Sequence, residues 1–305
     1  MNINKQKFDV TATVYSLAAL TCWIIGPLCI KQLTGWVDFW TQNMLRYSIA
    51  ALLLLPFLLF SIRHKKVDRS IWKNALVPTI PNIVMQSCWA AGFYYINPAF
   101  LTLIAKSGIL WTILFSMIFF LDERPLLKSA RFWTASVAMI IGLTGVTILG
   151  SNFAAKATII GLIFVFSASF TWSLYTVGVK AFLSNYDSRI SFAVVSLYTT
   201  VALIIVAALF GKPSDCLSMP PLGWIIIIVS GATSLALSHS FYYAAIKRIG
   251  ATIPSLVTLA QPFGILVVSR VIFAEKLTAP QWIFGIILLA GAALAVWAQE
   301  HLNKN

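Results

Sequence analysis

The chain has 305 residues, of which 59% are hydrophobic and 10% are charged, a charge density well below the roughly 25% that is typical of soluble domains. A chain of this composition cannot cover a water-facing surface. Its formal net charge of +13 would favour nucleic-acid binding in a soluble protein, but the basic residues cluster in short gaps between long apolar runs. We therefore expect membrane lipid, and no nucleic acid, as the partner of this chain.

Ten apolar segments follow one another along the chain, and each is long enough for a helix to cross about 30 Å of hydrocarbon. Charged or turn-forming residues separate them, and no gap is long enough for a soluble domain. The expected fold class is therefore all-α and integral to the membrane, with ten transmembrane helices. The segments lie at residues 10–30, 39–61, 74–95, 98–121, 132–150, 158–179, 190–211, 222–245, 251–273 and 279–298.

Lysine and arginine are distributed unequally between alternate loops. Fifteen of them lie on one side of the predicted membrane, and only Lys31, Lys156, Lys212 and Lys276 lie on the other. Cytoplasmic loops carry the excess of basic residues. We therefore expect a multi-pass protein of the cell inner (plasma) membrane, with both termini in the cytoplasm.

The two halves of the chain carry a weak internal repeat. FYY at 93–95 recurs at 241–243, and FFLDER at 119–124 is matched by VIFAEK at 271–276. Residues 1–150 and 151–305 then hold five spans each, and an odd number of spans inverts the second copy in the membrane. This pattern predicts two inverted five-helix repeats, with a substrate site near the midplane. It also puts Glu123 at the cytoplasmic side and Glu275 at the opposite side.

Several stretches resemble the ten-helix EamA-type branch of the drug/metabolite transporter superfamily. They are Trp-Ile-Ile-Gly at 23–26, Leu-Arg-Tyr at 45–47, and residues 251–294, in which Pro262 precedes Glu275 by 13 residues. The resemblance covers nearly the whole chain. It implies two pseudo-symmetric repeats that carry small metabolites, often outward, by alternating access, and it leaves the cargo open. Leu110 stands where the first half would have the matching proline, so we expect no proline-induced kink in the fourth span.

Lys106 lies about eight residues, near 12 Å, into the fourth predicted span. Insertion scales put the cost of a central lysine at roughly 2.5 to 3.5 kcal/mol, so such a side chain usually faces a cavity or a partner. The alternative is snorkelling to the nearer interface, although the lysine stem is only about 6 Å long. We expect Lys106 to bind an anionic group of the substrate.

Other side chains at comparable depth are further candidates. Arg46 in the second span could join the same pocket or lock helices together through backbone carbonyls. His239 in the eighth span could act as a gate or proton relay, or it could be a hydrogen-bonded structural imidazole. A polar and aromatic set is expected to line the cavity, with interhelical bonding and packing as the alternatives: Asn82, Gln86, Trp89, Trp111, Trp172, Tyr175 and Gln261.

The spans contain no acid, and the sequence has no nucleotide-binding loop, metal-ligand cluster or catalytic constellation. We therefore expect no catalytic residue, cofactor or metal site. The leading hypothesis is a secondary transporter, an exporter by its resemblance, of a small zwitterionic or anionic metabolite, with an amino acid as the leading class. The alternatives are a lipid or lipid-linked head-group flippase, a cationic drug exporter, and, outside transport, a scaffold or membrane enzyme. The oligomeric state is not indicated.

Overall fold

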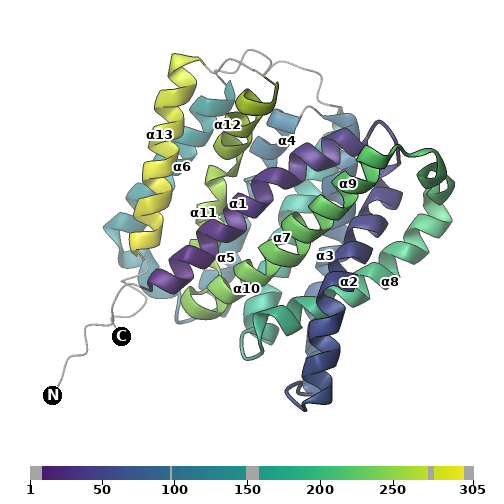
Figure 1. Ribbon diagram of the computed structural model, residues 1–305. Helices are drawn as coiled ribbons and strands as arrows, with labels where there is room; N and C mark the ends of the chain where they lie inside the picture. Colours follow the sequence, from purple (N-terminus) through teal and green to yellow (C-terminus); the bar gives the residue numbers. More distant parts are fainter. Residues whose placement is uncertain (1–8, 97, 149–157, 274–277, 299–305) are drawn as a thin grey trace.

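The computed structural model describes residues 9–96, 98–148, 158–273 and 278–298, which form helices joined by short turns and contain no strand. The helices form one bundle (Figure 1). They make up the ten spans of an integral membrane protein, and every predicted segment matches one span within four residues at each boundary. Seven spans are single helices: α1 (Val10–Leu33), α2 (Phe39–Arg63), α3 (Ser70–Tyr95), α6 (Ala130–Ile148), α7 (Ile159–Leu183), α8 (Ser188–Phe210) and α13 (Ala279–Trp297).

Three spans change their helical form along their length. The fourth consists of α4 (Pro98–Ala105) and α5 (Gly108–Phe119), and the ninth of α11 (Thr252–Val257), a 3₁₀ turn (Thr258–Ala260) and α12 (Gln261–Phe273). The eighth runs from α9 (Pro221–Ser230) through a π-helical segment (Gly231–Leu237) into α10 (Ser238–Ile249). Five of the described spans are long and apolar enough by themselves to cross a membrane, with Pro221–Ile249 counted as one.

The fourth span is interrupted although it has no proline there. The N–H of Ile109 donates to the carbonyl of Lys106 at 3.1 Å, and the N–H of Leu110 donates to that of Ser107 at 3.0 Å. Bonds between residues three apart tighten the helix into a 3₁₀ turn, a form that is common at functional hinges. Leu110 therefore excludes a proline kink, as predicted, but the helix is not continuous.

Short polar side chains start several of the spans. Asp9, Asp38, Thr158 and Asp187 each accept a hydrogen bond from a backbone N–H in the first turn of the helix that follows. Such N-caps satisfy donors that the helix itself leaves unpaired. The three aspartates thus lie at span ends, in agreement with the absence of acids from the predicted spans.

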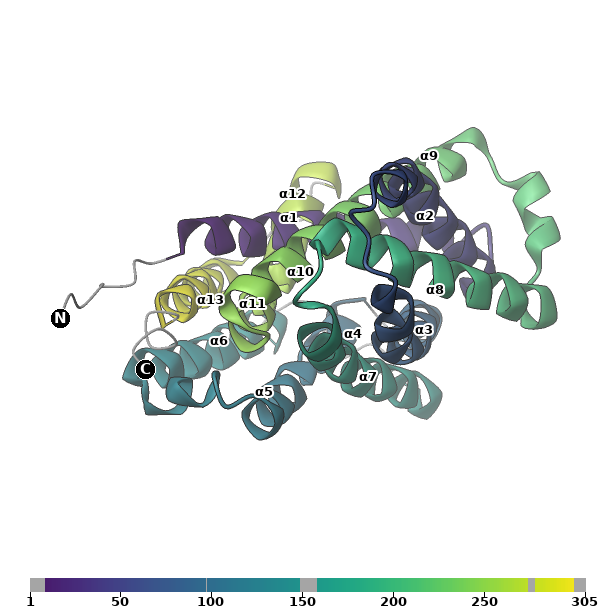
Figure 2. The same ribbon diagram turned by 90° about the horizontal axis from the view of Figure 1, so that it is seen from below.

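The helices pair as two related halves. The third span packs along the sixth, and the first span packs along the eighth. If span six repeats span one, then span eight repeats span three, and the two pairs are equivalent. Figure 2 shows the other pairs, α6 with α13 and α2 with α8, towards opposite sides of the molecule. A Cβ atom on Gly142 of α6 would lie 2.7 Å from the backbone nitrogen of Leu288 in α13, so this position needs glycine for close packing.

Two hydrophobic clusters flank the centre of the bundle. One joins α5, α6, α11 and α13 and includes Phe132 and Leu288. The other joins α2, α7, α8 and α10 and includes Tyr47 and Phe192. The interrupted fourth and ninth spans belong to the first cluster, to which they contribute Ile109 and Leu259.

Candidate functional site

A cavity of about 110 Å³ lies where the two interrupted spans meet. One water molecule needs roughly 10 to 15 Å³ of such space, so the cavity has room for a small organic molecule. Its walls come from the first four spans and from the sixth, eighth and ninth. The polar and aromatic lining residues are Trp23, Arg46, Gln86, Trp89, Lys106, Ser169, Trp172, Ser234, His239, Ser255, Thr258 and Gln261.

Lys106 follows α4 and reaches across to the ninth span. Its Nζ donates to Oε1 of Gln261 at 2.6 Å, and Nε2 of Gln261 donates to the backbone carbonyl of Trp23 at 2.7 Å. The lysine side chain is partly exposed, and it lines the cavity. No carboxylate is among the described residues that line this cavity. The site is therefore cationic, with a neutral amide held against the ammonium group.

Arg46 brings a second cation to the lining. It is 2% exposed, and its Nε donates to Oγ of Ser230 at 2.7 Å, while Nη1 donates to Oδ1 of Asn43 at 3.2 Å. Both sequence interpretations thus apply in part, because the guanidinium lines the cavity and also ties the second span to the eighth. It does so through side-chain oxygens, where the sequence suggested backbone carbonyls.

His239 is the second residue of α10 and lines the same cavity. Its Nδ1 lies 3.1 Å from the carbonyl oxygen of Leu235, which can only accept, so Nδ1 carries the proton of the neutral ring. The ring stacks on Phe192 with centroids 4.5 Å apart and meets the edge of Trp23 at 5.4 Å. Its Nε2 is buried and has no hydrogen-bond partner among the described residues. The imidazole therefore presents an unused acceptor.

Two tryptophans form the aromatic part of the lining near His239. The rings of Trp23 and Trp172 meet edge to face with centroids 5.3 Å apart, and Trp172 also stacks on Tyr242 at 5.5 Å. A third, Trp89, lies in α3 and packs against Phe93. These indoles supply apolar walls, which suit a cavity for an amphiphilic small molecule; the N–H of Trp23 itself donates to the carbonyl of Ser234 at 3.1 Å.

Three predicted residues lie away from this lining. Asn82 is fully buried and donates to Tyr47 and to Thr199, so it bonds the third span to the second and seventh. Tyr175 is also fully buried, and its hydroxyl lies 2.8 Å from that of Tyr243.

Trp111 is the third, and the structure corrects its predicted place in the cavity: it is 40% exposed on the outside of the bundle, beside Phe170. Their predicted depth in the membrane does not tell which face of a helix points inward.

Trp23 is a lining residue that sequence reasoning missed. The internal repeat carries a signal for it, because Trp23 and Lys31 precede Trp172 and Lys180 by 149 residues in both cases. If α1 and α7 are equivalent, a tryptophan predicted in the cavity from one half implies its counterpart from the other. Ser255 and Thr258 carry no comparable signal, since small hydroxyl residues are common in membrane helices.

Two inverted repeats of membrane helices around a central, cationic cavity define the class of this protein. The EamA-like transporter family matches residues 10–149 and again residues 159–297. The chain therefore belongs to the EamA-like transporter family, within the drug/metabolite transporter superfamily.

Relatives at low identity agree with this placement. The chain is 24% identical to an uncharacterised transporter of Clostridium kluyveri, over 96% of this chain and 93% of that protein. It is 23% identical to the uncharacterised transporter YyaM of Bacillus subtilis, over 87% and 85%. A protein of known crystal structure superposes with a TM-score of 0.75 at 16% identity, over 93% and 96% of the two chains, and shows the same fold.

Proposed function

We propose that this protein is a secondary transporter that exports a small zwitterionic or anionic metabolite by alternating access, with an amino acid as the leading class. Membership of the EamA-like family and the transporter relatives support transport and a multi-pass membrane location. The substrate class is our own step, and it rests on the lining of the central cavity.

The observation that carries the proposal is the position of Lys106. Its ammonium group lines the cavity and has a neutral amide, Gln261, at 2.6 Å. A carboxylate can form a charge-assisted hydrogen bond to this ammonium, which is stronger than the bond that an amide oxygen forms. Arg46 adds a second positive charge to the lining. A substrate with an anionic group is therefore recognised by charge.

The same lining argues against a cationic drug as the main substrate. An organic cation in a membrane site is stabilised by an acidic partner, because an unpaired charge is costly in a medium of low dielectric. The described lining residues include two cations and no carboxylate. A cation would thus be repelled at this site.

His239 is our candidate for gating or coupling. Its unpartnered Nε2 can accept a proton or an N–H donor of the substrate, and its ring lies against Trp23 and Phe192. Substrate binding among these rings would change the surroundings of the imidazole. We propose this coupling role beside the substrate-binding role of Lys106.

Orientation is part of the proposal. Helices α2, α5, α7 and α10 all finish at one end of the bundle, which we call the basic end. Its name reflects the basic residues at or near those helix ends, Arg63, Lys128, Lys180 and Arg248. The excess of lysine and arginine on this side supports a cytoplasmic location in the inner membrane, with both termini cytoplasmic.

Binding measurements on the purified protein test the substrate class. The probes are an amino-acid panel, the matching methyl esters that keep the amine but lack the carboxylate, a quaternary ammonium cation and a fluorescent short-chain phospholipid. We expect at least one amino acid to bind. Its methyl ester should bind with an affinity at least about tenfold lower. Binding of the cation alone would instead support a drug exporter, and binding of the phospholipid alone would support a flippase.

A further inference from the structure

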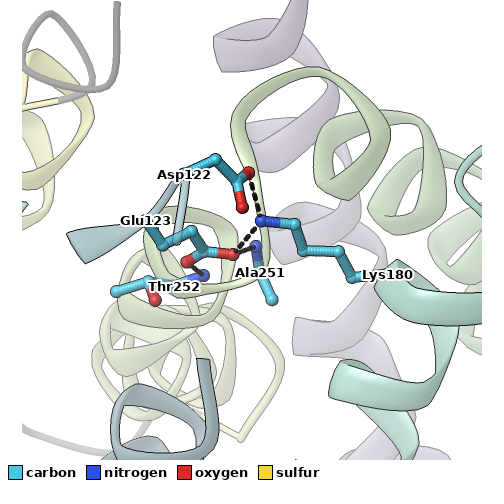
Figure 3. Close-up of polar contacts among 5 residues, drawn as sticks. All are labelled: Asp122, Glu123, Lys180, Ala251 and Thr252. Atoms are coloured by element: carbon cyan, nitrogen blue, oxygen red, sulfur yellow. Dashed lines mark hydrogen bonds and ion pairs between the residues drawn. The ribbon is translucent and has the colours of Figure 1, made fainter. Parts of the chain in front are cut away.

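A carboxylate at the basic end is buried completely. Glu123 follows α5 and is 0% exposed. Its oxygens accept the backbone N–H groups of Ala251 at 2.7 Å and Thr252 at 2.9 Å, and also Nζ of Lys180 at 2.8 Å (Figure 3). The neighbouring Asp122 touches the same ammonium at 2.6 Å, but its side chain is 69% exposed. Sequence reasoning put Glu123 at this side of the membrane without predicting its burial.

The three elements that meet at Glu123 all line the central cavity. Glu123 itself extends the fourth span, which lines the cavity with Ile109. Lys180 belongs to α7, which lines it with Trp172, and the two N–H groups begin the ninth span, which lines it with Ser255. One carboxylate of the first repeat therefore holds two walls that the second repeat supplies.

A layer of buried hydroxyl groups lies one turn further along α11. The hydroxyl of Tyr242 lies 2.6 Å from Oγ of Ser255, and it also lies 3.3 Å from Oγ1 of Thr176 in α7. All three residues are buried. From the basic end towards the cavity, α11 is thus held first by Glu123 and then by Tyr242.

Gly250 fits the same arrangement. Its φ of +80° is a backbone conformation that residues with a side chain rarely adopt, and a Cβ atom there would lie 2.6 Å from Oε1 of Glu123. The turn between α10 and α11 therefore approaches the carboxylate closely. This approach is what lets the first N–H groups of the ninth span reach the carboxylate.

We propose that Glu123 is a positioning residue that keeps the basic end of the central cavity shut, and that the cavity opens at this end only when the carboxylate releases the start of α11. The inference rests on the proposed function, because an end that closes matters only if substrate passes it. In that setting the latch formed by Glu123, Lys180 and the start of α11 sets how often the site faces the basic side.

Replacement by glutamine tests the latch with little change in size. In Glu123→Gln one carboxylate oxygen becomes an NH₂ group, which cannot accept a hydrogen bond, so at least one of the buried donors loses its acceptor. Asp122→Asn is the matched control, since it alters the adjacent carboxylate, which contacts Lys180 but not α11 in the described structure. Both variants carry one cysteine, Thr258→Cys in the cavity wall, and have Cys22, Cys29, Cys88 and Cys216 replaced by serine.

A membrane-impermeant maleimide is then added to vesicles from the basic side or from the opposite side. We expect Glu123→Gln to speed labelling from the basic side about tenfold, as when one charged hydrogen bond is weakened. Asp122→Asn should change it less than about twofold, since its exposed side chain bonds weakly. Labelling from the opposite side should not rise.

An unchanged rate in Glu123→Gln would overturn the proposal, and so would an equal rise from both sides, which indicates general loosening. If Glu123→Gln does not accumulate, Lys180→Met is used in its place, because that variant leaves the carboxylate bonded to α11. A smaller rise in the labelling rate from the basic side is then expected. No rise in that rate would overturn the proposal. Labelling needs no substrate, so its failure is distinct from a failure of the substrate-binding test.

Discussion

The Nζ atom of Lys106 and Oε1 of Gln261 lie 2.6 Å apart; Lys106 lies in the interruption of the fourth span, and Gln261 directly follows the 3₁₀ turn of the ninth. Gln261 is in turn fixed by its bond to the carbonyl of Trp23. A substrate anion that binds Lys106 must share or replace this amide. Binding at the centre therefore acts directly on the contact between the two halves.

Gln261→Glu should block the site for anions. The new carboxylate has nearly the shape of the amide and would pair with the ammonium of Lys106, so a substrate anion would have to displace a charged partner. We expect affinity for an anionic or zwitterionic substrate to fall by roughly 1.5 to 3 kcal/mol, the worth of a charged hydrogen bond. Isothermal titration of the purified variant measures this. Gln86→Glu, in the same lining, is the control, and an equal loss there would mean that any added acid is enough.

Trp172 and Trp111 should respond differently to replacement by alanine. Trp172 lines the cavity, whereas Trp111 is 40% exposed on the outside of the bundle. We expect Trp172→Ala to weaken substrate binding by about 1 kcal/mol or more through lost ring contacts, and Trp111→Ala to leave binding within about twofold of the original. Equilibrium binding to each purified variant decides this, and a larger loss for Trp111→Ala would return that residue to the site.

Gly250→Ala should destabilise the protein. The added Cβ would meet the Glu123 carboxylate at 2.6 Å, on a backbone with φ of +80°, and strain of this kind costs roughly 1 to 3 kcal/mol. The comparison is Gly35→Ala, where the nearest atom would lie 3.8 Å from the Cβ. Thermal unfolding in detergent should show a lower midpoint for Gly250→Ala only. Equal midpoints would mean that the turn relaxes freely around the new methyl group.

The sequence predicts the spans well because long apolar runs and basic loops are direct consequences of the membrane as a solvent. Lys106, Gln86 and Gln261, predicted at comparable depth, line one cavity. The sequence does not predict which way a side chain points, and Trp111 and Trp172 illustrate this: both are tryptophans at similar depth, and only Trp172 lines the cavity. The choice depends on how neighbouring helices pack.

Tertiary contacts explain the remaining differences. Glu123 reads as a loop residue in the sequence, but the start of α11 folds over it and supplies two backbone donors, which makes its burial tolerable. The interruption at Lys106 likewise has no proline to signal it, because it comes from a local 3₁₀ turn of the backbone. Neither feature has a pattern in local composition.

The charge of Lys106 is the centre of the account, and transport into proteoliposomes by Lys106→Met tests it most directly. Methionine keeps the approximate length of the side chain and removes the charge, so substrate affinity should fall about tenfold to 150-fold while thermal stability in detergent is retained. Lys106→Arg should keep part of the affinity, because the charge remains on a wider, forked group. The exposed Lys73 provides the control, and Lys73→Met should transport normally. Unchanged transport by Lys106→Met would contradict the account, since the ammonium would then play no part in recognising the substrate.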